Sequence, residues 1–298
     1  MKSLVKDLGG PVHYLDFGGE GEPVVLVHGL GGSSTNWLAV AEPLTKRFRV
    51  YALDLAGFGR TPLTGRQTTI ASNAALVGRF LDEVAGTPAI LAGNSMGGLI
   101  SLHVAAERPS AVKRLILVNA ALPVPRGVPI DRGVALLFAL RMAPFIGPYL
   151  MRRRAARSTP RRELEETLRL CGVDTRKLAP EVLAGMAAIA EERASMPWAH
   201  EAFALAARSL FRTNLDRRRF EATVRAVRAP TLLMQGTRDR LVALECAREV
   251  AKLRPDWRFA ILEGAGHTPQ LEIPEQWLSL VLGWLDDLDG TTAVRVAS

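Results

Sequence analysis

Ser95 has the sequence surroundings of a catalytic nucleophile. It lies in Gly93-Asn94-Ser95-Met96-Gly97-Gly98, directly after residues 89–92, an apolar run typical of a short buried strand. Glycines two positions before and two positions after the serine carry no Cβ, so they allow a strained turn that projects the hydroxyl above the strand end. Residues 99–107 then have helical character, and a helix N-terminus favours developing negative charge. The spacing therefore predicts a serine that attacks a carbonyl carbon.

A histidine and an aspartate follow two later strand-like runs. Residues 231–235 precede Asp239, and residues 259–262 precede His267, which stands in a glycine-rich loop. A base next to a serine hydroxyl and an acid that orients the base are the two groups that such a nucleophile needs. The other histidines lack this context. We interpret His13, His28 and His103 as structural or packing residues. The side chain of His200 could face either the pocket or solvent.

In these motifs and in their order along the chain, the sequence resembles the α/β-hydrolase superfamily over nearly its whole length. The resemblance implies an α/β fold in which Ser95 is the nucleophile, His267 the general base and Asp239 its orienting acid. Some relatives place the acid after an earlier strand, but Asn119 occupies that position here. The prediction for the acid therefore stays with Asp239.

The loop after the strand-like residues 23–27 is interpreted as the oxyanion hole. It contains His28-Gly29-Leu30-Gly31-Gly32-Ser33-Ser34. By the same resemblance, the backbone N–H groups of Leu30 and Met96 hold the oxyanion of a tetrahedral intermediate. A dinucleotide-binding loop is excluded, because the sixth position of G-x-G-x-x-G is Ser34 and no suitable partner acid stands out.

Two kinds of sequence pattern divide the chain. Residues 1–121 and 229–298 alternate short apolar runs with helical stretches, which predicts a mostly parallel sheet with helices on both faces. Residues 122–228 have few strand signals, and they lie where this fold usually carries a cap. We therefore expect a hydrolase core in two parts with an inserted helical cap. With 298 residues, 48% of them hydrophobic, the chain has enough apolar side chains for a large buried core.

The predicted cap combines apolar residues with most of the positive charge. It contains nineteen arginines and one lysine against eleven acidic residues, a charge of +9, whereas the whole chain carries +8. The apolar residues 134–151 are interrupted by Arg141, two prolines and a glycine, so they make a poor membrane span. We expect this run to cover the active site. Large apolar residues of this segment are candidates for the pocket wall. We assign Phe138, Met142 and Trp198 to substrate binding, and the further candidates are Leu137, Phe145 and Phe203.

The arginine clusters of the cap have two interpretations. The first, and the one we expect, is a solvated arginine-rich surface around Arg152-Arg153-Arg154 and Arg217-Arg218-Arg219. The second is a weak contact with an anionic membrane surface beside a lipophilic pocket. Nucleic acid is not expected as a partner, because the clusters are not interleaved with aromatics and no binding module is present.

The expected chemistry requires no metal and no organic cofactor. Cys171 and Cys246 form neither a disulfide framework nor a metal-ligand pattern. The first seven residues are followed by glycines and a proline rather than by the apolar segment of a signal peptide. We therefore expect a cytoplasmic protein.

The expected substrate is a small apolar acyl compound, cleaved as a carboxylic ester through an acyl-enzyme on Ser95. Hydrolysis of carbon–carbon bonds in ring-cleavage products is the alternative, because residues 93–98 closely resemble the elbow of that family. That family usually places an aromatic residue just after the catalytic histidine, whereas Thr268 follows His267 here. An alternative of another class is a ligand receptor built on a hydrolase scaffold, which a complete set of catalytic residues disfavours.

Overall fold

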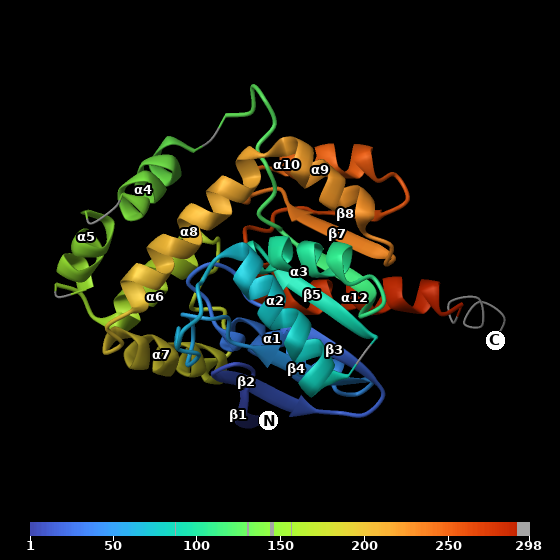
Figure 1. Cartoon of the computed structure of the whole chain (residues 1–298), viewed down its shortest axis with the longest axis horizontal. Helices are drawn as coiled ribbons and strands as arrows, with labels where there is room; N and C mark the ends of the chain where they lie inside the picture. Colours follow the sequence, from blue (N-terminus) through green and yellow to red (C-terminus); the bar gives the residue numbers. More distant parts are fainter. Residues whose placement is uncertain (87, 130, 144–145, 156, 291–298) are drawn as a thin grey trace.

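The computed structural model describes residues 1–86, 88–129, 131–143, 146–155 and 157–290. Its centre is an eight-stranded sheet with the strand order β1-β2-β4-β3-β5-β6-β7-β8 (Figure 1). The pairs β1–β2 and β2–β4 are antiparallel, and every other neighbouring pair is parallel. The strands are β1 (Lys2–Asp7), β2 (Pro11–Gly18), β3 (Glu22–Val27), β4 (Phe48–Leu53), β5 (Ala89–Asn94), β6 (Val112–Val118), β7 (Thr231–Gly236) and β8 (Arg258–Leu262).

Helices cover both faces of this sheet. On one face, α1 (Leu38–Leu44) and α12 (Pro274–Leu288) enclose a core in which Trp37 and Trp277 are fully buried. On the other face, α2 (Ile70–Phe80), α3 (Met96–Glu107) and α10 (Leu244–Leu253) pack over a second cluster that includes Phe58 and Phe80. Burial on both faces suits the nearly continuous apolar runs of the parallel strands. The predicted α/β fold is confirmed.

The parallel strands bring five loops to one edge of the sheet. Neighbouring strands end at nearly the same height, since Asn94 pairs with Val118 and Gly236 pairs with Leu262. The residues that follow these strand ends must therefore lie close together, as in other open α/β sheets. The loops after β3, β5, β6, β7 and β8 carry His28, Ser95, Asn119, Asp239 and His267, respectively.

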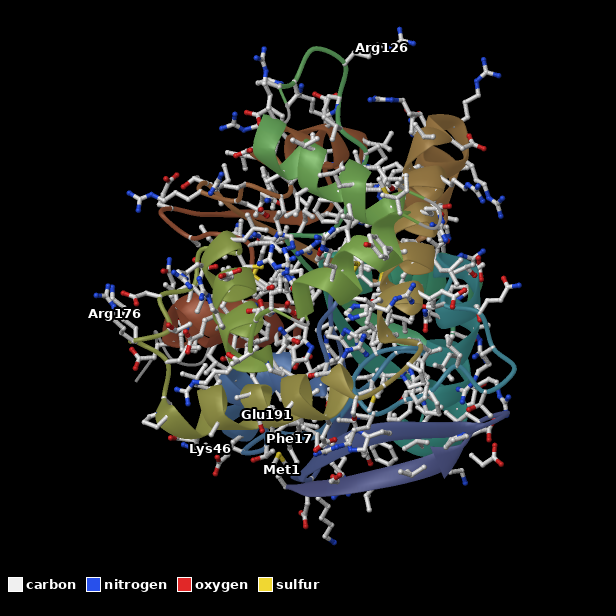
Figure 2. All side chains as sticks on the ribbon, turned by 90° about the vertical axis from the view of Figure 1, so that its left-hand side faces the viewer. Met1, Phe17, Lys46, Arg126, Arg176 and Glu191 are labelled. Atoms are coloured by element: carbon white, nitrogen blue, oxygen red, sulfur yellow. The ribbon has the colours of Figure 1, made fainter. Side chains whose placement is uncertain are left out.

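In the part of the chain that the structure describes, six helices lie between β6 and β7. Figure 1 shows α8 along the sheet edge, with α4 and α5 on its outer side, and Figure 2 views the molecule from that side. The division into a core (1–121 and 229–298) and a cap (122–228) stays a prediction. The six helices are α4 (Arg132–Met142), α5 (Ile146–Ala155), α6 (Pro160–Leu170), α7 (Pro180–Ala194), α8 (Ala199–Leu215) and α9 (Arg217–Ala226).

Capping residues fix where two of these helices begin. The Asp131 carboxylate accepts hydrogen bonds from the N–H groups of Gly133 (2.9 Å) and Val134 (3.1 Å) at the start of α4. Thr159 caps α6 in the same way, and Pro160 occupies the first turn. None of the helices in the described ranges is long and apolar enough to cross a membrane. Shorter elements complete the chain: η1 (Ser34–Trp37), η2 (Leu81–Ala85) and α11 (Pro269–Glu272).

Candidate active site

Ser95 occupies the sharp turn between β5 and α3. Its backbone has φ 55° and ψ −120°, a conformation that non-glycine residues rarely adopt. Three backbone hydrogen bonds hold it there: the Ser95 N–H donates to the Val118 carbonyl (3.0 Å), and the Ser95 carbonyl accepts from the N–H groups of Ala121 (2.9 Å) and Leu99 (3.2 Å). The side chain is partly exposed beside the N-terminus of α3. The strained backbone conformation of Ser95 is therefore found at a residue whose hydroxyl group can be reached from solvent.

Glycines around Ser95 are required by close backbone contacts. A Cβ on Gly93 would lie 2.3 Å from the Gly97 carbonyl oxygen, and a Cβ on Gly97 would lie 2.3 Å from the Val27 carbonyl oxygen. A Cβ on Gly29 would lie 3.0 Å from the Ser95 Cβ. The loop after β3 and the turn after β5 are thus in direct contact, which only residues without side chains permit.

Asp239 and His267 form a buried pair. The His267 Nδ1–H donates to Asp239 Oδ2 at 2.8 Å, and the two side chains are 6% and 0% exposed, respectively. Asp239 Oδ2 also accepts from Asn119 Nδ2 (2.9 Å) and Gln235 Nε2 (3.0 Å). Its Oδ1 accepts from the Leu241 and Val242 amides. Five donors thus surround a single carboxylate.

These donors keep Asp239 ionised. Burial by itself would raise the pKa of Asp239, but the charge and hydrogen bond of His267, together with the Leu241 and Val242 amides, lower the pKa below its usual value. An ionised carboxylate that accepts from Nδ1–H fixes the His267 tautomer, so that Nε2 is the nitrogen able to accept a proton. The arrangement is that of an oriented general base.

The His267 loop is tied to the serine turn and to the helices between β6 and β7. Asn94, the residue before Ser95, donates from Nδ2 to the His267 carbonyl at 3.0 Å. The His267 N–H donates to the carbonyl of Cys171, just after α6, at 2.6 Å. Glu272 accepts from the N–H groups of Gly266 (2.7 Å) and Thr268 (2.9 Å). Ser95 and His267 are therefore held on one connected frame.

Leu30 and Met96 lie where the resemblance placed the oxyanion hole, on the loop after β3 and at the first residue of α3. Within the described residues, neither N–H group donates to another protein group. His28 fixes this loop: its Nδ1–H donates to the Gly29 carbonyl (2.7 Å), and its Nε2 accepts from the Leu55 N–H (3.1 Å). Burial lowers the pKa of His28 to about 4, so the ring is neutral and serves as a brace.

A second buried His–Asp pair braces the same loop from its other end. His13 Nδ1 lies 2.7 Å from Asp54 Oδ2, and the Asp54 carboxylate accepts from the N–H groups of Ser34 (2.6 Å) and Arg60 (2.9 Å). Ser34 ends the glycine-rich loop that contains Leu30. The pair therefore connects the loops after β3 and β4.

Asn119, Gln235 and Glu272 were not singled out by the sequence analysis as parts of the site. Asn119 donates to both Asp239 and the Gly266 carbonyl (2.6 Å), so it bridges the acid loop and the histidine loop. Its backbone also has a positive φ of 45°. For Asn119 and Gln235 the available signal was a polar residue directly after, or at the end of, an apolar strand, because buried polar groups need hydrogen-bond partners.

The cap residues predicted for substrate binding lie at different places. Phe138 packs against Phe211 between α4 and α8 (ring centroids 5.9 Å apart), and the Met142 carbonyl accepts from Arg208 (2.9 Å). Trp198 precedes α8, and Phe145 lies outside the described residues. Phe203 on α8 lies close to the glycine-rich loop after β3, since its ring is 3.2 Å from where a Cβ on Gly31 would stand.

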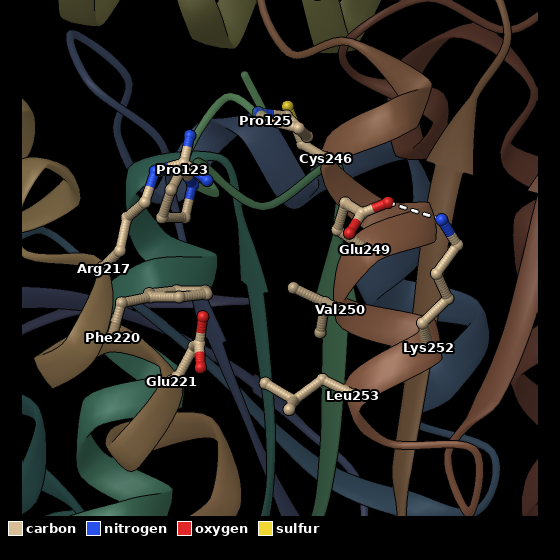
Figure 3. A pocket seen from close by; sticks show the side chains of 10 residues that line it. All are labelled: Pro123, Pro125, Arg217, Phe220, Glu221, Cys246, Glu249, Val250, Lys252 and Leu253. Carbon is tan, nitrogen blue, oxygen red and sulfur yellow. Dashed lines mark hydrogen bonds and ion pairs between the residues drawn. The ribbon is translucent and has the colours of Figure 1, made fainter. Parts of the chain in front are cut away.

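One pocket of the structure lies outside the cluster around Ser95. It has a volume of about 320 Å³ and is formed between α9, α10 and the segment after β6 (Figure 3). Glu249 and Lys252 form an ion pair on its rim (2.6 Å). Its walls contain none of the five loop residues that meet at the sheet edge. The lining residues are Pro123, Pro125, Arg217, Phe220, Glu221, Cys246, Glu249, Val250, Lys252 and Leu253.

Neither cysteine has the surroundings of a reactive thiol. Both are free, and burial raises the pKa of Cys171 to about 12 and that of Cys246 to about 11. At neutral pH both thiols therefore stay protonated, and the thiolate is the reactive form. In the described part of the chain, no group of three or more His, Cys, Asp or Glu side chains has an arrangement that could hold a metal ion.

Comparison with known proteins defines the class. Residues 22–274 match the alpha/beta hydrolase fold family, and the chain belongs to that family. The 2-hydroxy-6-oxo-2,4-heptadienoate hydrolase of Pseudomonas putida is 29% identical over 276 residues, covering 90% of each protein. The family and its hydrolase relatives show that this chain is an enzyme.

Other relatives differ in length and activity. The dihydrolipoyllysine-residue acetyltransferase component of an acetoin cleaving system in Cupriavidus necator is 38% identical over 122 residues, 41% of this chain. That match spans only 32% of the longer relative. Among solved structures, a bacterial membrane phospholipase A has a TM-score of 0.70 and 29% identity, covering 97% of this chain and 86% of that one. Cfl2 from Burkholderia cenocepacia has a TM-score of 0.79 at 21% identity, over 95% of both chains, and shows the fold alone.

Proposed function

We propose that this enzyme hydrolyses apolar carboxylic esters through an acyl-enzyme intermediate on Ser95. The observation that carries the proposal is a serine held at φ 55° on the same frame as a buried, hydrogen-bonded histidine–aspartate pair. A strained turn, an oriented base and two free amides are the parts that acyl transfer needs, and the chain supplies them from five neighbouring loops.

The reaction begins with proton transfer from the Ser95 hydroxyl to His267 Nε2, as the serine oxygen attacks the ester carbonyl carbon. The carbonyl electrons move to its oxygen, and the Leu30 and Met96 N–H groups stabilise that oxyanion. Collapse of the intermediate breaks the bond to the alcohol, which takes the proton from His267. Water then cleaves the acyl-enzyme by the same sequence, with His267 as base and later as acid.

The apolar specificity rests on α8 and its neighbours. Phe203 is a large apolar side chain close to the oxyanion loop, and Phe138, Met142 and Trp198 supply further apolar surface from α4 and the start of α8. An acyl chain that contacts such residues gains about 0.8 kcal/mol per buried methylene. We therefore expect medium-chain or bulky acyl groups to be preferred over acetyl.

The nucleophile is tested with a fluorophosphonate probe, which forms a covalent bond to an activated serine. Wild type should be labelled, Ser95→Ala should not, and Ser101→Ala should be labelled as wild type, because Ser101 lies inside α3 and serves as a matched control. Intact-mass spectrometry measures the label. Equal labelling of wild type and Ser95→Ala would move the nucleophile to another residue.

A second candidate is the hydrolysis of carbon–carbon bonds in ring-cleavage products. The 29% identity with the heptadienoate hydrolase over 90% of both proteins, together with the similar turn at residues 93–98, favours it specifically. Purified enzyme should therefore be compared on p-nitrophenyl esters of graded chain length and on a 2-hydroxy-6-oxo-dienoate. A higher kcat/KM on the dienoate would replace the ester proposal. Absence of turnover on every compound, with ligand binding retained, would favour the receptor alternative.

A further inference from the structure

Helix α4 has an exposed apolar face. Its inner side packs against α8 through Phe138. On its outer side, Leu136 is 62% exposed and Leu140 is 45% exposed, and Ala135 and Ala139 of the same helix are also exposed. Residues four positions apart share one helix face, so these two leucines form a continuous apolar strip. A helix that is apolar on both sides normally has a second partner.

Helix α5 packs against α4 and also has an exposed apolar face. Ile146, Tyr149 and Leu150 are 57%, 54% and 39% exposed, and their spacing places them on one face of the helix. Arg153 follows on the same face, four positions after Tyr149. We name the five exposed apolar side chains of the two helices the apolar strip: Leu136, Leu140, Ile146, Tyr149 and Leu150.

Cations without carboxylate partners border the apolar strip. Arg154 is paired with Glu163 and Glu166, but Arg152 and Arg153 are exposed and, among the described residues, form no ion pair. Arg126 stands at the upper edge of the same side of the molecule (Figure 2). The segment 122–228 as a whole carries +9. The strip therefore belongs to a segment with a large net positive charge.

We infer that the apolar strip and Arg152–Arg153 dock on an anionic lipid surface. Leucine and isoleucine side chains would enter the boundary between headgroups and acyl chains, Tyr149 would sit at headgroup level, and the arginines would extend to the lipid phosphates. A second copy of the chain fits less well, because it would bring together two segments that each carry a net charge of +9. A lipid surface supplies both the apolar interior and the negative charge.

The position of the strip connects this surface to the proposed chemistry. Helix α4 packs on α8, and Phe203 of α8 contacts the oxyanion loop at Gly31. Arg141 of α4 lies over the Phe203 ring, 5.5 Å from its centroid. Only one helix thus separates the lipid-facing strip from the loop that would hold the oxyanion. Docking would bring the active site close to apolar substrates dissolved in the membrane. The proposed ester hydrolysis does not itself require such docking.

Vesicle co-sedimentation tests the docking without using activity. Wild type is mixed with phosphatidylcholine vesicles that either contain or lack phosphatidylglycerol, at low and at physiological salt. Binding should require the anionic lipid and weaken with salt. Arg152→Gln/Arg153→Gln should weaken it about 25-fold, since each arginine near an anionic surface contributes about fivefold in affinity. Leu136→Gln/Leu140→Gln should weaken it roughly tenfold or more.

Matched variants elsewhere separate docking from general charge or hydrophobicity. Arg248→Gln/Lys252→Gln removes two exposed cations from α10, and Leu288→Gln removes an exposed leucine from α12; both should bind as wild type. Ser95→Ala should also bind as wild type, so failure of the ester proposal would leave this one standing. Negligible wild-type binding, or equal loss in the α10 variant, would overturn the inference. So would a dimer in sedimentation velocity that Leu136→Gln/Leu140→Gln dissociates.

Discussion

At the scale of single residues, Asp239 accepts more hydrogen bonds than orientation of one histidine requires. His267, Asn119 and Gln235 all donate to Oδ2, and two amides donate to Oδ1. Such a carboxylate stays in one position and remains charged, which the proposed mechanism requires of the group that stabilises an imidazolium. The surrounding donors are thus as much a part of the site as the acid.

Asp239→Asn should lower kcat on a fast ester by about 10³- to 10⁴-fold, because an amide in this position favours the wrong histidine tautomer. Stopped-flow or steady-state assays with a p-nitrophenyl ester measure the loss. Circular dichroism of the variant should match that of wild type. Near-complete activity in Asp239→Asn would mean that another carboxylate orients His267.

His28 makes stability depend on pH. Burial lowers its folded-state pKa to about 4 from the ordinary 6.5, so between these values the unfolded chain binds more protons than the folded one. The free energy of unfolding should therefore fall as pH decreases from 6.5 to 4, by up to roughly 3 kcal/mol from this residue. Urea unfolding of wild type and His28→Gln across this range measures the slope. An unchanged slope in the variant would assign the pH dependence to other groups.

At the scale of elements, the helix after Ser95 begins earlier than the sequence predicts. The pattern indicates a helix from residue 99, whereas α3 starts at Met96. Gly97 and Gly98 hide the first turn, since glycine is a poor helix former. Their presence is explained by packing: a Cβ on Gly98 would lie 2.7 Å from the Ala120 Cβ, and one on Gly97 would meet backbone oxygens. Close packing between elements therefore requires glycine at these positions, although glycine has a low helix propensity.

Gly97→Ala should lower the melting temperature sharply, because its new Cβ would stand 2.3 Å from the Val27 carbonyl oxygen and 2.4 Å from that of His28. Neither backbone atom can move without shifting a strand end. A loss of about 3 kcal/mol or more is expected. Gly283→Ala in α12 is the control: nothing lies within 4 Å of its Cβ, and helix propensity predicts a gain of up to about 1 kcal/mol. Equal melting temperatures for the two variants would contradict this packing argument.

At the scale of the whole molecule, the sequence indicated which residues lie at the sheet edge, but not the contacts from other segments that hold them in place. Ser95, Asp239 and His267 each follow a strand, and parallel strands bring such residues together. The contact from Cys171 to His267 joins the segment after α6 to the loop after β8, and no local pattern indicates it. The cap contacts were harder still, because amphipathic helices specify an apolar face and leave its partner open.

The segment 122–228 is held to the rest of the chain by one half-buried arginine more than by its ion pairs. Arg193 of α7 donates to the Gly57 carbonyl at 2.9 Å and lies 5.3 Å from the Phe58 ring centroid. Burial lowers its pKa to about 10, so it stays charged at neutral pH. The neighbouring Glu192 pairs with Arg60, but both side chains are partly exposed, at 42% and 35%. Exposed pairs contribute little, whereas charged hydrogen bonds that are shielded from solvent contribute more.

Arg193→Met should therefore raise amide hydrogen exchange in α7 by about tenfold, through the lost hydrogen bond and cation–π contact. Glu192→Gln, the matched neighbour, should change it less than about twofold. Mass spectrometry of peptides from α7 and from β5 and β6 follows both regions at once. If the segment 122–228 is a separate cap, exchange in β5 and β6 should stay as in wild type. An equal rise in the central strands would mean that the segment and the sheet open as one unit, which would overturn the predicted division of the chain.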